Sequence, residues 1–276
     1  MQDLNKHVAI SDEFINEAPD RAKGELQYTR RVSRIITPGT LIDEGFMDPW
    51  ENNYLLSIHV DPKPLEKEKA VTKSPGSSSV SSVLNLPRTE VGLAWIDLSS
   101  GDFLTQSTDI ASLPTAVARI KPREIVLDSI FAEAEHSRIV SILQDDGHII
   151  TFQEPSKEPL TVKDWIPMLE DVVVDFDLAN FSPSEVTAGG SLLHYVKHKL
   201  LGSRTRLQAP VRHQAEDHMS IDKNSLRALE IRSTMRDGTH EGSLLHSLKN
   251  TVTKSGTRLL SQRLCECYDT TIQKTC

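Results

Sequence analysis

The chain has 276 residues, of which 38% are hydrophobic and 25% charged, so it is long and apolar enough to bury more than one core. Its net charge is −8, and residues 41–200 carry 25 acidic against 13 basic side chains, which makes them a poor candidate for contact with phosphates along their length. No run of eighteen apolar residues occurs and the first twenty residues carry five acids, so we expect no membrane partner and no targeting peptide.

The N-terminal segment, residues 1–31, is polar. Its only phasing is helical, around Asp12 to Ile15, and we expect weak structure there. Three arginines follow or overlap its end, Arg30, Arg31 and Arg34. They suggest either a phosphate clamp or the solvated edge of a strand.

The next part of the chain predicts strands. Residues 53–60 contain the apolar YLLSIHV between two Asp-Pro pairs, which is typical of a buried strand. Residues 91–98 and 103–106 predict a β-hairpin around the Ser-Ser-Gly-Asp turn. Between them, residues 63–89 are rich in Lys, Ser and Pro, and we expect a disordered insertion.

Helices and strands alternate from residue 110 onward. The apolar spacing predicts helices over 110–120 and 131–143, and β-branched runs predict strands over 124–127 and 148–152. The resulting order indicates an α/β layer with helices on a mixed sheet. It is compatible with a ribonuclease-H-like architecture.

That architecture raises one enzymatic alternative, a metal-dependent nuclease. Asp97 and Asp128 end two predicted strands, and Asp102 or Glu124 lies nearby, so these carboxylates are candidates for a site with two divalent ions. Asp97 is equally explained as an acceptor in the following turn, and Asp128 as a helix N-cap.

The remaining third is helical in phasing. Ser182 and Glu185 form a capping-box pattern with Pro183 in the first turn, and Gly189-Gly190 allows close packing of a neighbour. Gly202 is expected to stop this helix. Further on, Asp222 and Thr253 are predicted N-caps, and the inward-facing residues between and after them are expected to be Leu226, Leu229, Ile231, Leu244, Leu245, Leu248, Val252, Leu259, Leu260 and Leu264. These helices present more apolar surface than they can cover, so we expect later helices of a larger core to pack on them.

Metal sites and reactive thiols are not indicated. Cys265, Cys267 and Cys276 contain no C-x-x-C pair and are interpreted as free thiols of a reducing compartment. His194 and His198 have a helical i, i+4 spacing but no intervening Glu of the H-E-x-x-H kind, which favours solvated surface histidines. We therefore assign no catalytic, cofactor-binding or metal-binding residue.

Three sequence blocks, in this order, resemble the MutS family of DNA mismatch-recognition proteins. They are RIITPGT with the downstream ENNYLLSIH, then VGLAWIDLSSGDF, then GGSLLHYVKHKL followed by IDKNSLRALEI and GSLLHSLKNTVTKSGTRLL. The segments PWENNYL and LPTAVARIKPREIVLD are most similar to the sequences of the fungal mitochondrial branch of the family. The resemblance implies a domain order: residues 1–46 as the end of the mismatch-binding domain with its linker, 47–200 as the connector, 201–264 as the start of an incomplete helical core, and 265–276 as an atypical tail.

The resemblance also implies a function for the parent protein. A MutS protein is a dimeric, ATP-driven clamp on mismatched double-stranded DNA, with the connector passing the state of the ATPase to the clamp through flexible joins, here near 39–45 and 202–210. The family's F-x-E reader belongs upstream of Val32, where no F-x-E string occurs, and the G-x-x-x-x-G-K-[ST] loop for ATP and Mg²⁺ does not occur in this sequence.

We therefore expect no enzymatic activity from the isolated chain. A truncated or mis-spliced gene model with an out-of-frame tail would explain the two ends. We expect a mitochondrial location, with the nucleus as the alternative. A free-standing protein-interaction module without DNA or ATP activity remains the alternative function from another class.

Overall fold

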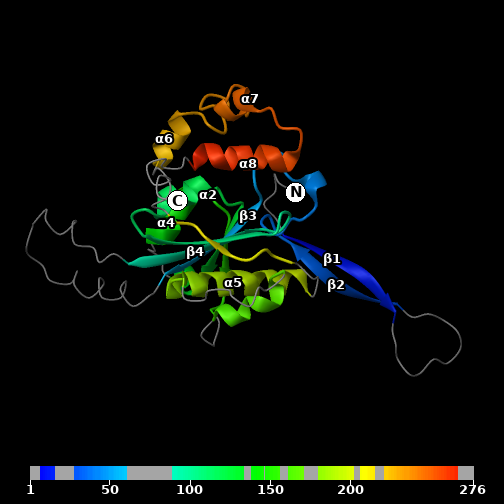
Figure 1. Ribbon diagram of the computed structural model, residues 1–276. Coiled ribbons are helices and arrows are strands. Elements are labelled where there is room, and N and C mark those ends of the chain that lie inside the picture. Colours follow the sequence, from blue (N-terminus) through cyan, green and yellow to red (C-terminus); the bar gives the residue numbers. More distant parts are fainter. Residues whose placement is uncertain are drawn as a thin grey trace, which may run out of the picture.

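A mixed six-stranded sheet with helices on both faces lies at the centre of the molecule (Figure 1). The computed structural model describes residues 7–15, 28–60, 89–133, 138–145, 147–155, 161–170, 180–201, 206–214 and 221–266. The strands are β1 (Val8–Ile15), β2 (Tyr28–Ile36), β3 (Tyr54–Val60), β4 (Glu90–Asp97), β5 (Asp102–Asp109), β6 (Glu124–Asp128), β7 (Ile150–Gln153) and β8 (Val211–Arg212). The α-helices are α2 (Leu113–Ile120), α3 (Ile130–Glu133), α4 (Arg138–Asp145), α5 (Pro183–Leu200), α6 (Lys223–Ala228), α7 (Leu244–Leu248) and α8 (Lys254–Cys265), with short 3₁₀ helices η2 (Glu44–Phe46), η4 (Val162–Asp164) and η5 (Ile166–Met168).

The sheet has the strand order β7-β6-β3-β4-β5-β8. Strands β3, β4 and β5 form an antiparallel meander, and β6 and β7 add in parallel on the β3 side. The predicted hairpin is confirmed, with Gly101 of its turn at a positive φ of 80°. The predicted α/β class, a mixed sheet with helices, is also confirmed.

One face of the sheet packs against α2, α3 and α4. Alternate side chains of β3 and β4, such as Leu56 and Leu93, point into this core and meet Val117 of α2 and Leu143 of α4. The helix predicted over 110–120 begins at Leu113, because the Asp109 carboxylate accepts from the Ser112 amide and holds the preceding residues in a turn. The helix predicted over 131–143 is described as α3 and α4.

The other face packs against α5. Ser182 and Glu185 form the predicted capping box, in which each side chain accepts from the other residue's amide. Trp165 is fully buried and lies against Gly189, where an added Cβ would be 2.5 Å from the indole ring. The predicted close approach at the Gly189-Gly190 pair is therefore confirmed, although Gly202 lies outside the described residues.

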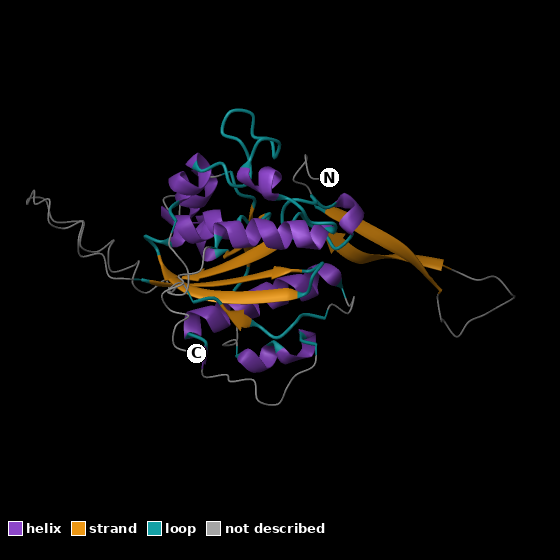
Figure 2. Ribbon diagram, turned by 45° about the horizontal axis from the view of Figure 1, so that its top comes forward, coloured by secondary structure: helices purple, strands orange, loops and turns teal. Residues whose placement is uncertain are grey.

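A two-stranded ribbon, β1 and β2, projects from the body of the molecule (Figures 1 and 2). The helical phasing around Asp12 to Ile15 indicated the wrong structure, because these residues form the end of strand β1. Their cross-strand pairs with β2, such as Glu13 with Arg30, outweigh the local periodicity. Of the predicted insertion 63–89, only the buried Thr89 is among the described residues.

Helices α6, α7 and α8 lie over the α2 side of the sheet (Figure 1). Asp222 and Thr253 cap α6 and α8 as predicted. The inward-facing assignment is only partly right: Ile231 and Leu245 are buried, whereas Leu229, Leu248 and Val252 are 59%, 52% and 101% exposed. Helix α7 ends at Leu248, so the helical spacing does not continue to Val252.

The helices of the described part also bear on the expected absence of a membrane partner and on the C-terminal tail. None of the helices in the described ranges combines the length and apolarity needed to cross a bilayer. Helix α8 runs to Cys265, which is buried and free, while residues 267–276 lie outside the described part.

Candidate functional site

The four carboxylates of the nuclease hypothesis do not converge. Asp97 lies opposite Tyr54, whose side chain belongs to the α2 face, whereas Glu124 lies opposite Leu55, whose side chain belongs to the α5 face. Asp128 lies at the opposite end of β6 from Glu124. Within the described ranges, no three His, Cys, Asp or Glu side chains are grouped to hold a metal ion. The structure therefore does not favour the nuclease hypothesis.

Two of these acids have the structural role that the sequence offered as the alternative. Asp97 is 1% exposed and accepts from the Ser99 amide and hydroxyl, at 2.9 and 2.6 Å, and from the Asn53 amide at 3.2 Å. Asp128 accepts from the Ile130 amide at 3.0 Å, at the start of α3. Asp102 accepts from the Ser100 hydroxyl in the hairpin turn.

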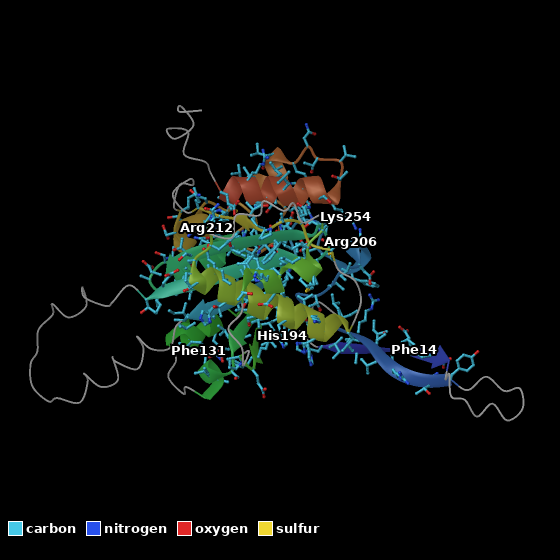
Figure 3. All side chains as sticks on the ribbon, turned by 60° about the horizontal axis from the view of Figure 1, so that its bottom comes forward. Phe14, Phe131, His194, Arg206, Arg212 and Lys254 are labelled. Atoms are coloured by element: carbon cyan, nitrogen blue, oxygen red, sulfur yellow. The ribbon has the colours of Figure 1, made fainter. Side chains whose placement is uncertain are left out.

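The histidine and arginine candidates lie on the surface. His194, labelled in Figure 3, and His198 are exposed on α5, as the surface interpretation predicted. Arg30 pairs with Glu13 at 2.8 Å, and Arg34 lies 4.0 Å from Asp43. Adjacent residues of a strand point to opposite faces, so Arg30 and Arg31 do not form one clamp and the solvated strand edge is the better description.

The polar residues that the structure does bring together lie at two joints of the sheet. We call the first the ribbon joint; it consists of the turn 37–40, Glu124, Thr151 and Tyr195. Glu124 is fully buried and accepts from the Gly39 amide at 3.0 Å, the Thr151 hydroxyl at 2.7 Å and the Tyr195 hydroxyl at 2.6 Å. Burial, followed by the charge of Glu124, raises the pKa of Tyr195 well above its ordinary value, so the phenol is a neutral donor.

The second, which we call the core joint, consists of residues 48–54, the end of α2 with Lys121 and Arg123, and residues 232–266 of the helical part. Its central contact is Arg232, which donates to the carbonyl oxygens of Arg119 at 2.8 Å and Ala118 at 3.4 Å. These are last-turn carbonyls of α2, which a helix leaves without intrahelical partners. A cation at this end is also favoured by the helix dipole. Arg232 therefore fastens the helical part to the end of α2.

Glu51 adds an ion-pair network to the core joint. It pairs with Lys121, and its second oxygen lies 2.9 Å from Arg123. Burial alone would raise the pKa of Glu51, but the charge of Lys121, followed by those of Arg123 and Arg232, holds it below the ordinary 4.5. Glu51 thus remains ionised at neutral pH.

Trp50 fills the outer side of the core joint. Its ring stacks on His240 with centroids 5.2 Å apart, and the Lys249 ammonium lies 4.1 Å from its centroid. His240 also lies 3.8 Å from Asp48. The segment before β3 is therefore held by residues nearly two hundred positions later in the chain.

The inner side of the core joint encloses only a small cavity. Its walls include Arg119, Arg232, Glu266 and Gln262, and its volume is about 20 Å³, enough for one water molecule. This volume is far too small for a nucleotide or a metabolite. The contacts at both joints hold described segments of the protein together.

Sequence reasoning missed both joints. Glu124 was considered only as a metal ligand, and Glu51, Arg232 and Tyr195 were given no role. One observation available in the sequence was the acid at the first position of a buried strand, Glu124 before IVLD, since a buried charge needs partners. Flexible joins were expected near 39–45 and 202–210, and residues 202–205 of the second lie outside the described residues. In the described parts, residues 37–40 form a packed turn, and Leu207 is buried with its carbonyl accepting from the Glu170 amide.

Comparison with known proteins identifies the two parts on either side of the core joint. A family model described as MutS domain II matches residues 79–209, and one described as MutS domain III matches residues 224–267. The chain belongs to the MutS family. The first model covers β4 to the sheet edge near β8, and the second covers α6, α7 and α8.

Curated relatives carry the same family name. The chain is 32% identical over 268 residues to the DNA mismatch repair protein MutS of Wolbachia pipientis wMel, which covers 95% of this chain and 28% of that protein. It is 31% identical to the DNA mismatch repair protein MutS of a Bradyrhizobium species, covering 93% of this chain and 26% of that protein. The chain thus spans little more than a quarter of the length of these MutS relatives.

Proposed function

We propose that this chain is the connector and the beginning of the helical core of a MutS-type DNA mismatch-repair protein. The observation that carries the proposal is the succession of the two domain matches, 79–209 and 224–267, in one chain. In this function the sheet domain is a mechanical part between the clamp on mismatched double-stranded DNA and the ATPase of the complete dimeric protein. The Arg232 contacts support it, since they tie the helical part to the end of α2 in the sheet domain.

The finer fold assignment is part of the same proposal. Three antiparallel strands in sequence, extended by two strands parallel to the first, are the arrangement we assign as ribonuclease-H-like. We take residues 1–46, 47–200, 201–264 and 265–276 as the four domains expected from the sequence, and add that the sheet itself continues to β8 at Val211–Arg212.

The helical part is proposed to be the start of a larger core. Its exposed large apolar side chains are Leu229, Met235, Leu244, Leu248, Val252 and Leu259. Such side chains are costly to leave in water when they gather on one segment. Later helices of the kind that longer MutS relatives have room for would cover them.

Neither ATP nor Mg²⁺ is assigned a site in this chain. The sequence has no phosphate-binding loop, and the small cavity at the core joint has no room for a nucleotide. Both belong to the complete protein in this proposal. So do the dimer partner and the residues that touch DNA.

Disruption of the gene followed by a mutation-accumulation line tests the function and the location together. We expect single-base substitutions and short insertions or deletions to rise in the mitochondrial genome, because unrepaired mismatches become fixed at replication. A rise confined to the nuclear genome would support the nuclear alternative. Mutation rates equal to those of the parent strain in both genomes would contradict a role in mismatch repair.

A further inference from the structure

We propose that Glu124 is a positioning residue that fixes the direction of the β1–β2 ribbon relative to the connector sheet. The ribbon enters the sheet domain through the Thr-Pro-Gly-Thr turn at residues 37–40, directly after β2. The Glu124 carboxylate holds that turn, the sheet and α5 at one point. The contacts alone support the role of Glu124 in fixing the ribbon. That this role matters for mismatch recognition rests on the proposed function.

The turn itself is tightly closed. The Thr37 amide donates to the Thr40 hydroxyl at 2.8 Å, and the Thr40 amide donates to the Thr37 carbonyl at 3.1 Å. The two hydroxyls lie 3.0 Å apart, and both threonines are 1% exposed. The end of the ribbon is therefore followed by a rigid element and not by a free linker.

The turn is docked on the sheet through Gly39. Its amide donates to Oε2 of Glu124 at 3.0 Å. A Cβ on residue 39 would lie 2.6 Å from Cδ1 of Leu55 and 3.0 Å from Cβ of Glu124, so only glycine permits this approach. Position 39 needs glycine for space and not for an unusual φ.

The other oxygen of Glu124 reaches two more elements. Oε1 accepts from Thr151 on β7 and from Tyr195 on α5, at 2.7 and 2.6 Å. His7, directly before β1, lies 3.8 Å from the same oxygen. One carboxylate thus lies close to His7 before the ribbon and contacts the turn after its second strand, the sheet and α5.

A buried carboxylate is an expensive way to stabilise a core, since desolvation opposes the charged form. A well-packed apolar residue serves stability as well at lower cost. Only a group with several acceptor positions can satisfy donors from three elements at once, and that requirement explains an acid at residue 124. Replacing it by Gln introduces an NH₂ group facing donors and leaves at least one of them without an acceptor.

The test follows the ribbon direction through the distance between two spin labels, measured by pulsed electron–electron double resonance on the complete chain. Spin labels are placed at Phe14→Cys on the ribbon and His194→Cys on α5, both exposed (Figure 3), after Cys265→Ala, Cys267→Ser and Cys276→Ser. Glu124→Gln and Tyr195→Phe are compared with this background. The matched control is Tyr54→Phe, a buried tyrosine at the same end of the sheet but on its opposite face.

We expect a narrow label-to-label distance distribution in the background and in Tyr54→Phe, and a broadened or shifted one in Glu124→Gln and Tyr195→Phe with unchanged circular dichroism. Tyr195→Phe decides the matter if Glu124→Gln does not fold, because it removes a single hydroxyl. A distribution in folded Tyr195→Phe or Glu124→Gln as narrow as the background, at the same distance, would overturn the proposal. The measurement uses no DNA, so a positive result without a mutator phenotype would refute the proposed function alone.

Discussion

Gly92 is the position where a single methyl group should do most damage. It lies in β4 on the α5 face, where the first turn of the helix approaches the strand without an intervening side chain. A Cβ at residue 92 would lie 2.1 Å from the Ser184 carbonyl oxygen, 2.2 Å from the Ser184 carbonyl carbon and 2.7 Å from the Glu185 nitrogen. All three are backbone atoms, so no side chain can turn aside.

The expected loss in the free energy of unfolding follows from the displacement that Gly92→Ala requires. The Ser184 oxygen must retreat by more than about 1 Å to regain van der Waals distance, and α5 must move with it. That motion disturbs the Ser182–Glu185 capping box and the 3.2 Å pair between Glu185 and Arg212. Overpacking typically costs 1–3 kcal/mol, and we expect Gly92→Ala to cost about 3 kcal/mol or more, because the obstacle is backbone.

Urea unfolding of the 276-residue chain, followed by circular dichroism, measures this loss. The matched control is Gly45→Ala, where nothing lies within 4 Å of the added Cβ, and we expect it to change the free energy of unfolding by less than about 0.5 kcal/mol. In thermal unfolding, Gly92→Ala should lower Tm by roughly 6–12 °C. If Gly92→Ala and Gly45→Ala unfold at the same urea concentration, the close approach of β4 and α5 is refuted.

Three further outcomes follow from single side chains. Ser182→Ala should cost about 1 kcal/mol in urea unfolding, because the Glu185 amide loses its capping acceptor; an unchanged midpoint would contradict the cap. Arg232→Met should cost about 1–3 kcal/mol by leaving the α2 carbonyls without a donor, and Arg232→Lys should recover only part; full recovery by lysine would show that the forked geometry is unimportant. The unfolded-state pKa of Glu51 is about 4.5 and its folded-state pKa is lower, so its ionised form stabilises the fold above pH 4.5 and this contribution disappears as the pH falls through the folded-state value. The stability gap between the native chain and Glu51→Gln, measured in urea from pH 7 to 3, should therefore narrow below pH 4.5; a gap that widens on acidification would contradict the sign.

Local patterns predicted the sheet domain well where the periodicity and the tertiary burial agree. The alternation in YLLSIHV, the turn at Gly101 and the capping box at Ser182 each depend on near neighbours, and each appears in the structure. The segment around Asp12 did not follow its helical phasing. Its partners are on β2, across a connection that no local window includes.

The joints could not be derived from local patterns for the same reason. Glu124 meets Gly39 and Tyr195, which lie 85 and 71 positions away in sequence, and Tyr54 meets Gln262 across 208 positions. A charged side chain in a single sequence indicates only that a partner is needed. Which residue supplies it depends on how the sheet brings distant segments together, and the same carboxylate therefore suggested a metal ligand.

The pairing of β3 with β4 continues in register from Tyr54 opposite Asp97 to Val60 opposite Val91. Since paired residues of antiparallel strands lie about 5 Å apart, the polypeptide leaves the sheet and re-enters it at practically the same place. A two-residue turn is enough to span that separation. New chain termini between Val60 and Val91, or a domain inserted there, should leave all strand pairings unchanged. The position is therefore suited to circular permutation or to the insertion of a reporter domain in the intact protein.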